Sequence, residues 1–348
     1  MLLPALSSVG GASPLLLLAV ALLVDACAGE MPVLFRVVPH PVVLIGSAVG
    51  TLERRLNRDK RSERDRFARG VITVAALIAA SVLVGLALAA FCRQFDYGWV
   101  AELALVAVLL AQRSLFDHVA AVERALGTDG LAAGREAVSH IVGRDPNSLD
   151  AHGVARAGIE SLAENFSDGV VAPAFWYALF GLPGILAYKT ANTLDSMIGH
   201  LSPRYRAFGW AAARFDDLVN FVPARLSGLL VATAAAIVPR AAPGKALATM
   251  WRDAGKHRSP NAGWPEAAMA GALGLALAGP RRYSGHVAED PWIGDGRARA
   301  TPQDIRRALL VYATACGLLI ALLALIYVAA ADLGGPAIPP GPRITATV

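Results

Sequence analysis

Residues 71–91 read VITVAALIAASVLVGLALAAF, a run without a single charged side chain. A helix needs about 20 apolar residues to cross a hydrocarbon core about 30 Å thick, so this run is long enough to span a membrane. Outward from it, residues 308–331 form a second clean apolar stretch and residues 5–24 a third. Residues 99–115 are a weaker partner that carries one acid, Glu102. We therefore expect membrane-spanning helices at these positions.

The composition of the whole chain agrees with a membrane protein. Of its 348 residues, 55% are hydrophobic and 17% are charged, and the mean hydropathy is +0.49. A soluble domain carries about 25% charged residues, so this chain lacks the side chains to cover a globule of its size. The apolar content excludes a disordered chain, and three cysteines in this length exclude a disulfide scaffold.

The first apolar stretch has a second interpretation. Residues 26–28 resemble the small-residue cleavage site of a secretory signal. No Lys or Arg precedes the stretch, which favours a retained span over a removed signal.

Other apolar stretches are interrupted by helix-breaking or polar residues. Residues 170–187 contain two prolines and two glycines, Gly181 among them, and only the second half of residues 218–238 resembles lipid-facing sequence. Residues 267–278 are too short to span alone. We expect an all-α, polytopic integral membrane protein with several transmembrane and broken or re-entrant helices, built as one membrane-embedded domain over residues 1–348.

Basic residues near the spans predict which ends face the cytoplasm. Residues 53–69 hold eight Lys or Arg against four acids, and arginines between residues 281 and 307 precede the last span. By the positive-inside tendency both segments are cytoplasmic, and both termini face the other side. We expect a basic cytoplasmic linker at 53–69, a polar cytoplasmic segment at 117–165 and a flexible tail at 332–348. The net charge of +5 follows from this bias, and no pattern of a nucleic-acid-binding module is present.

Acids at helical spacing mark the first polar cluster, ESLAENFSDG at residues 160–169. Glu160, Glu164 and Asp168 are spaced i, i+4 and i+8, so on a helix they form one stripe, with Asn165 beside it. Like charges at this spacing destabilise a helix, so a cation should compensate. Mg²⁺ carrying phosphate oxygens suits the site, because it is typically held by one or two carboxylates. A solvated helix face is the alternative interpretation.

The second cluster lies in YKTANTLDSMIGH at residues 188–200. Lys189, Asn192 and Asp195 follow one another at steps of three, which places them on one helix face. This set suits phosphate and metal chemistry. It also suits a hydrogen-bond network between packed helices.

The third cluster is RFDDLVNFVPAR at residues 214–225. The spacing pairs Arg214 with Asp217, and Asp217 with Arg225 two turns later, which predicts one charged ladder. Asp216 and Asp217 are adjacent and cannot share a face, so one can reach a ligand while the other pairs with arginine. A buried ion-pair brace is the alternative for Arg214.

Two shorter motifs and several absences complete the survey. SPNAGWPE, residues 259–266, is a turn leading into a Gly/Ala-rich helix, where Glu266 also complements the helix dipole. His40 stands between two prolines, and a lone histidine there is more often structural than a ligand. The chain has no P-loop, nucleophile elbow, zinc signature or dinucleotide fingerprint. A membrane protein with a polar, acid-rich site fits an enzyme or a transporter.

Taken together, these motifs resemble the CobD/CbiB family of cobalamin biosynthesis, the adenosylcobinamide(-phosphate) synthases. The resemblance covers nearly the whole chain, with several long motifs in the right order. The chain departs from the family pattern at two places. One is Phe166 in the motif at 160–169, and the other is residues 201–203, where a more polar stretch is usual in the family. The motifs lie at residues 23–25, 39–41, 160–169, 192–200, 208–210, 214–226, 259–271 and 293–295.

The resemblance implies an ATP-dependent amide ligase of the bacterial cytoplasmic membrane that uses ATP and Mg²⁺. Its substrates would be adenosylcobyric acid, through a propionate carboxylate, and (R)-1-amino-2-propanol or its O-phosphate. The product would be adenosylcobinamide or its phosphate, and the sequence does not distinguish the two amines. As partners we expect membrane lipid, with a second copy of the chain or late cobalamin-pathway enzymes as further possibilities, and no nucleic acid.

The implied chemistry assigns roles to the clustered residues. Carboxylate and amine do not condense unaided, so we expect ATP to activate the acid as an acyl phosphate, with Mg²⁺ and cations on the phosphoryl oxygens. We expect catalytic roles for Glu160, Glu164, Asn165, Asp168 and His40; metal binding by Glu164, Asp168, Asp195, Asp216 and Asp217; and substrate or phosphate binding by Lys189, Asn192, Arg214, Arg225, Ser259, Asn261 and Glu266.

A corrinoid transporter, or a membrane scaffold for late pathway enzymes, is the alternative function. It too explains broken helices with polar residues at depth. The motifs contain no inverted repeat, and acids at helical spacing are costly for mere passage of a bulky substrate, which favours the ligase.

Overall fold

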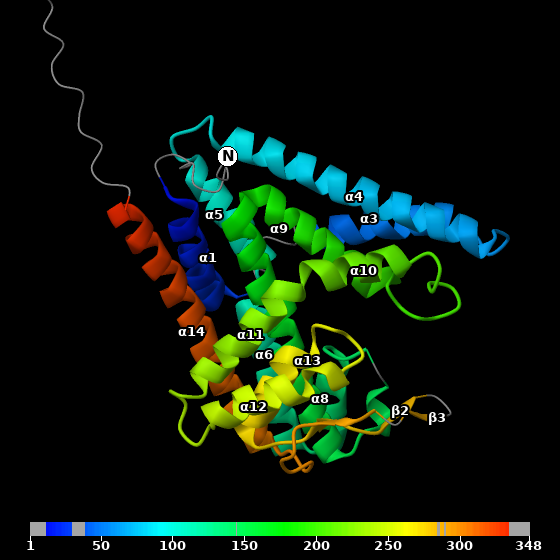
Figure 1. Cartoon of the computed structure of the whole chain (residues 1–348), viewed down its shortest axis with the longest axis vertical. Coiled ribbons are helices and arrows are strands. Elements are labelled where there is room, and N and C mark those ends of the chain that lie inside the picture. The colour runs from blue at the N-terminus through cyan, green and yellow to red at the C-terminus, as the bar shows by residue number, and fades with distance from the viewer. Residues whose placement is uncertain (1–11, 30–38, 144, 284–285, 289, 334–348) are drawn as a thin grey trace, which may run out of the picture.

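The computed structural model is almost entirely helical, which confirms the expected all-α class (Figure 1). It describes residues 12–29, 39–143, 145–283, 286–288 and 290–333. The helices are α1 (Pro14–Ala28), α3 (Pro41–Leu56), α4 (Glu63–Cys92), α5 (Gly98–Leu109), α6 (Gln112–Arg124), η2 (Ala125–Asp129), α7 (Leu131–Ser139), η3 (Pro146–Ser148), α8 (Ala151–Phe166), η4 (Ser167–Val171), α9 (Ala172–Ile198), α10 (Trp210–Val219), α11 (Phe221–Ala234), α12 (Pro243–Asp253), η5 (Ala254–Lys256), α13 (Gly263–Leu273) and α14 (Pro302–Leu333).

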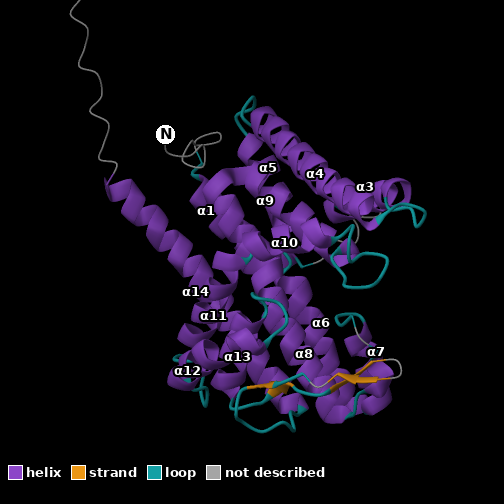
Figure 2. Ribbon diagram, turned by 45° about the vertical axis from the view of Figure 1, so that its right-hand side comes forward, coloured by secondary structure: helices purple, strands orange, loops and turns teal. Residues whose placement is uncertain are grey.

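Short strands occur only in the connection between α13 and α14, among the residues that the structure describes. They form two antiparallel pairs, β1 with β4 and β2 with β3, at the edge of the helical body (Figure 2). The strands are β1 (Leu277–Ala278), β2 (Arg281–Tyr283), β3 (His286–Ala288) and β4 (Trp292–Ile293).

Four helical segments are long and apolar enough to cross a membrane, judged by length and composition. They are Glu63–Cys92, Gly98–Asp129, Ala151–Ile198 and Pro302–Ala330. The expected spans at 71–91 and 308–331 are therefore found. The first apolar stretch gives only the 15-residue α1, which begins at Pro14, and residues 1–11 lie outside the described part.

The broken helices that the sequence predicts are present. α9 contains one residue outside the helical region, Gly181 at φ 65° and ψ −149°, a conformation that costs glycine little because it has no Cβ. Pro183 follows two residues later, so the helix axis changes direction there. Other breaks separate α5 from α6 at residues 110–111 and α10 from α11 at Asn220.

The packing places α4 along α9 and sets α1 and α14 against each other (Figures 1 and 2). Ser81 of α4 and Thr190 of α9 share a hydrogen bond of 2.6 Å between their hydroxyls. The outer face of α4 exposes large apolar side chains, among them Leu83 and Phe91, as expected for a helix that faces lipid.

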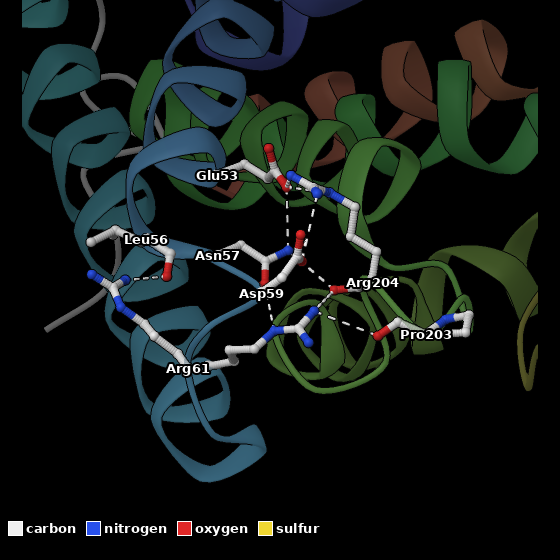
Figure 3. A network of polar contacts seen from close by, with 8 residues as sticks. Glu53, Leu56, Asn57, Asp59, Arg61, Pro203 and Arg204 are labelled. Atoms are coloured by element: carbon white, nitrogen blue, oxygen red, sulfur yellow. Dashed lines mark hydrogen bonds and ion pairs between the residues drawn. The ribbon is translucent and has the colours of Figure 1, made fainter.

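The segment expected to be a basic linker, residues 53–69, comprises the end of α3, a short turn and the start of α4. Its polar side chains are partly buried: Arg66 Nε donates to Asn57 Oδ1 at 2.8 Å, and Arg204 donates to Glu53 at 2.7 and 2.9 Å. Figure 3 shows Asn57 between Glu53 and the Arg204 segment. The hairpin is ordered because these buried groups satisfy one another.

The other two expected segments are placed as follows. Residues 117–165 fold as helices from α6 to α8, and α8 is largely buried. Most of the tail at 332–348 lies outside the described residues.

Candidate functional site

The first polar cluster, residues 160–169, does not form one regular helix. α8 ends at Phe166, and η4 (Ser167–Val171) is a π-helical turn that leads into α9. A π turn widens the helix by one residue and is frequent at functional sites. It places Asp168 at the junction of two helices, where side chains of α9 and α10 approach it.

Four acids and one lysine gather at this junction. The charge on Asp168 interacts with the charges on Asp216, Glu164, Asp195 and Lys189. We call Asp168, Asp195 and Asp216 the acid cluster. The sequence placed these residues in three separate motifs, and the fold brings them together.

Tyr188 and Asn220 connect the elements that carry the acid cluster. The Tyr188 hydroxyl lies 3.0 Å from Asn220 Oδ1 and 3.1 Å from the backbone carbonyl of Asp168, and it can donate to either. Asn220 Nδ2 then donates to Asp216 Oδ2 at 2.9 Å. Both Tyr188 and Asn220 are buried, so they hold η4, α9 and α10 in fixed relation.

Tyr188 and Asn220 are not among the site residues that the sequence predicts. Their positions in the sequence could have indicated them, because Tyr188 directly precedes Lys189 and Asn220 lies four residues after Asp216.

Asp216 has one satisfied oxygen and one that is not. Its Oδ1 is buried and has no hydrogen-bond partner among the described residues, although the Asn192 amide lies close enough to stabilise the charge. Burial raises the pKa of Asp216 to about 7, and the nearby charge of Asp195 adds to the effect. A buried carboxylate oxygen without a donor is a natural ligand for a cation.

No three His, Cys, Asp or Glu side chains in the described part of the chain form a metal-binding group by themselves. Mg²⁺ usually keeps several waters and takes one or two carboxylates plus substrate phosphates. The oxygen donors of the acid cluster suit such an ion.

The neighbouring acid, Asp217, pairs with arginine. Arg214 Nη1 lies 3.0 Å from Asp217 Oδ2, the pair that the spacing predicts. Burial raises the pKa of Asp217, and the Arg214 charge opposes that shift. Asp216 thus belongs to the acid cluster, whereas Asp217 pairs with Arg214, and the Asp217 charge also acts on Asp195.

The expected ladder from Asp217 to Arg225 is wrong, because the chain bends at Asn220 between α10 and α11. The Arg225 guanidinium instead lies over the rings of Phe221 and Trp264, at 3.6 and 4.4 Å from their centroids. Its Nη1 donates to Asn261 Oδ1 at 3.3 Å, and Asn261 Nδ2 donates to the Asp217 backbone carbonyl at 2.7 Å.

The residues at 259–266 build the start of α13. Ser259 Oγ accepts hydrogen bonds from the backbone N–H groups of Asn261 and Ala262, at 3.2 and 3.3 Å. Glu266 is buried, with its Oε1 3.6 Å from His257 Nε2. These contacts give Ser259, Asn261 and Arg225 a structural part in joining α11 to α13, and their substrate-binding role stays a prediction.

Two predicted catalytic residues lie in structural settings. Glu160 is buried and accepts a hydrogen bond of 2.9 Å from the Ala278 backbone N–H, so it is bound to the β1 segment. His40 caps α3: its Nδ1 accepts from the Val42 N–H, and its Nε2 lies 3.2 Å from the Val108 carbonyl. Both ring nitrogens of His40 are therefore engaged.

Glu164 and Asn165 lie on the exposed side of the end of α8. Asn165 Nδ2 donates to the Ser161 carbonyl at 2.9 Å, and Asn165 also lines a cavity of about 420 Å³. Lys189 is half-buried and its charge interacts with that of Asp168.

Comparison with known proteins identifies the family. The family described as CobD/Cbib protein matches residues 18–312. The Sinorhizobium sp protein named "Cobalamin biosynthesis protein CobD" is 54% identical over 305 residues, which cover 87% of this chain and 94% of that protein. Proteins of the same name from Brucella melitensis biotype 1 and Rhodobacter capsulatus are 49% and 47% identical, each over 89% of this chain and 95% and 98% of their own lengths. No solved structure matches. The chain therefore belongs to the CobD/CbiB family.

Proposed function

We propose that this protein acts in cobalamin biosynthesis as an ATP-dependent amide ligase. It would join a propionate carboxylate of adenosylcobyric acid to (R)-1-amino-2-propanol or its O-phosphate. The observation that carries the proposal is the acid cluster, in which Asp216 presents a buried carboxylate, bordered by the Asn192 and Asn220 amides, beside two further acids and Lys189. The relatives' names, which refer to cobalamin biosynthesis, supply the pathway.

The acid cluster suits phosphoryl transfer from ATP. One or two of the carboxylates of Asp168, Asp195 and Asp216 would hold Mg²⁺, which would supply positive charge to the phosphoryl oxygens when bound. Lys189 adds a cation close to Asp168. Arg214 is half exposed in its pair with Asp217 and can reach outward to a phosphate.

The surrounding residues keep the acids in place. Tyr188 and Asn220 bridge η4, α9 and α10, so none of the three carboxylates depends on a mobile loop. Such preorganisation matters because phosphoryl transfer relies on positioning and electrostatics more than on covalent help from the protein.

The basic helix ends support a membrane orientation for the proposed enzyme. α4 and α14 run in the same general direction, so the basic start of α4 and the arginine-bearing start of α14 face the same way (Figure 1). We place these ends in the cytoplasm, where ATP is available, and the protein in the bacterial cytoplasmic membrane.

The test is a reconstituted reaction with purified protein, adenosylcobyric acid, MgATP and either amine. The ligase predicts ADP release in equal amount to amide product, and the ratio of kcat/KM values names the preferred amine. Corrinoid uptake into vesicles without ADP release or amide formation would instead support the transporter.

A further inference from the structure

Two cavities lie on the polar face of α6, and one of them borders the motif at residues 160–169. One of about 420 Å³ is lined by Asn165 and Gly169 of that motif, and one of about 340 Å³ lies against the end of α1. The two cavities share Ser114 and His118. His118 is thus a titratable side chain that borders both spaces.

The start of α6 is held by three hydrogen bonds, one of which joins it to residues 160–169. The Ala111 N–H donates to the Gly169 carbonyl at 3.1 Å, and the Gln112 N–H donates to Asp25 Oδ2 at 2.6 Å. The hydroxyl of Tyr312, from α14, donates to the Gln112 carbonyl at 2.7 Å. His118 lies less than two turns from this junction, so its position relative to Gly169 is well fixed.

The His118 ring is oriented as a base. Its Nδ1 lies 2.8 Å from the Ser114 backbone carbonyl, which can only accept, so Nδ1 carries the proton. Nε2 is then the acceptor, and it has no partner among the described residues. His40, by contrast, uses both nitrogens in capping α3.

Few charges border these cavities. Arg113 and Asp117 of α6 form an ion pair of 2.8 Å with each other. His140, after α7, lies 3.9 Å from Glu136 on its own segment, and Asp25 of α1 is bound to the start of α6. Among the side chains that line these cavities, His118 is therefore the one whose Nδ1 is held by the backbone and whose Nε2 can accept a proton.

We propose that His118 is the catalytic base that deprotonates the attacking amine, which binds in the cavity between α6 and Asn165. The inference rests on the proposed ligase function and adds His118 to the residues that the sequence predicts for the site. A primary amine has an ordinary pKa of about 10, so at neutral pH it is an ammonium ion without a free electron pair. Imidazole is the side chain suited to accept this proton at neutral pH.

The proposed step balances. His118 Nε2 takes one proton from the ammonium group, and the neutral amine attacks the carbonyl carbon of the acyl phosphate made from the nucleoside triphosphate. The C–N bond forms as the bond from carbon to the phosphate oxygen breaks, and the phosphate leaves with that electron pair. The second amine proton goes to the phosphate, and His118 releases its proton to water.

The experiment compares two nucleophiles in wild type and His118→Asn. Hydroxylamine is uncharged at neutral pH and needs no base, so its hydroxamate reports acid activation and correct folding. We expect His118→Asn to form hydroxamate at the wild-type rate while amide formation falls about 10²- to 10⁴-fold. Amide formation by the variant should then rise up to about tenfold per pH unit toward the pKa of the amine.

The other outcomes are equally clear. Amide formation within a few-fold of wild type would overturn the assignment, and so would equal loss of both products, which would mean a role in folding or acid activation. If the wild-type protein makes neither product, the proposed function itself fails.

Discussion

The carboxylate of Glu160 accepts a hydrogen bond from the backbone N–H of Ala278, which follows 118 residues later in the chain. Both groups are buried, and Ala278 has a positive φ of 58°, which is uncommon for alanine. The bond holds α8 to the β1 segment and separates Glu160 from the acid cluster. The acidic stripe that the sequence predicts is therefore divided: Glu160 binds the backbone of the β1 segment, and Asp168 belongs to the acid cluster.

Glu160→Ala should destabilise the protein, because it leaves the buried Ala278 N–H without this acceptor. An unmatched buried donor costs about 1–3 kcal/mol. Thermal unfolding in detergent measures the loss, and Glu160→Gln, which keeps an acceptor oxygen, is the matched control. Normal Tm with abolished turnover in Glu160→Ala would show that Glu160 is catalytic after all.

Mg²⁺ binding should depend on pH through Asp216, whose pKa burial raises to about 7. The unfolded chain loses this proton near pH 4, so between about pH 4 and 7 the folded state binds more protons. Stability of the metal-free protein therefore falls as pH rises across this window. Mg²⁺ must displace the same proton, so its affinity should rise up to about tenfold per pH unit until pH 7.

Asp216→Asn is the control for this pH dependence. It keeps the shape of the side chain and removes the ionisable group, so both slopes should flatten. Isothermal titration with Mg²⁺ and unfolding at pH 5 to 8 measure them. Unaltered slopes in the variant would assign the proton to another residue.

Glu164→Gln separates a metal role from a structural one. Glu164 is exposed, and its negative charge acts on Asp168. If Glu164 and Asp168 share Mg²⁺ on a phosphoryl group, turnover should fall on the order of 10³-fold. Stability should be unchanged or higher by a few tenths of a kcal/mol, because like-charge repulsion is relieved. An active but less stable variant would contradict metal binding by Glu164.

The α3–α4 hairpin offers a matched pair of arginines. Arg66 is buried and donates to Asn57, whereas Arg58 is exposed. Arg66→Gln should lower stability by about 1–3 kcal/mol, because Asn57 loses its donor. Arg58→Gln should leave both stability and turnover within error, and equal losses in both variants would point to a shared role in lipid binding.

The main features of the fold follow from the sequence because they depend on local chemistry. The run at 71–91 has the length and polarity of a span. Gly181 and Pro183 break a helix whatever packs against it. The break between α5 and α6 has no such signal, since apolar residues surround it. It depends on Asp25, Gly169 and Tyr312, which reach it from three other segments.

The site was predictable in part for the same reason. Spacing identifies Asp168, Asp195 and Asp216 as candidates and pairs Arg214 with Asp217. It does not show that Glu160 is bound to Ala278, because that contact joins distant segments. Ser114 and His118 are spaced i, i+4, which could have drawn attention to that face of α6, but only the fold places it beside Asn165 and Gly169.

The most direct test of the central claim follows an oxygen atom. Adenosylcobyric acid labelled with ¹⁸O in its reacting propionate is converted with MgATP and amine, and the released phosphate is analysed by mass spectrometry. Activation of the carboxylate as an acyl phosphate predicts one ¹⁸O in phosphate for each amide formed. Amide formation with unlabelled phosphate, or ATP hydrolysis with no amide, would contradict the account.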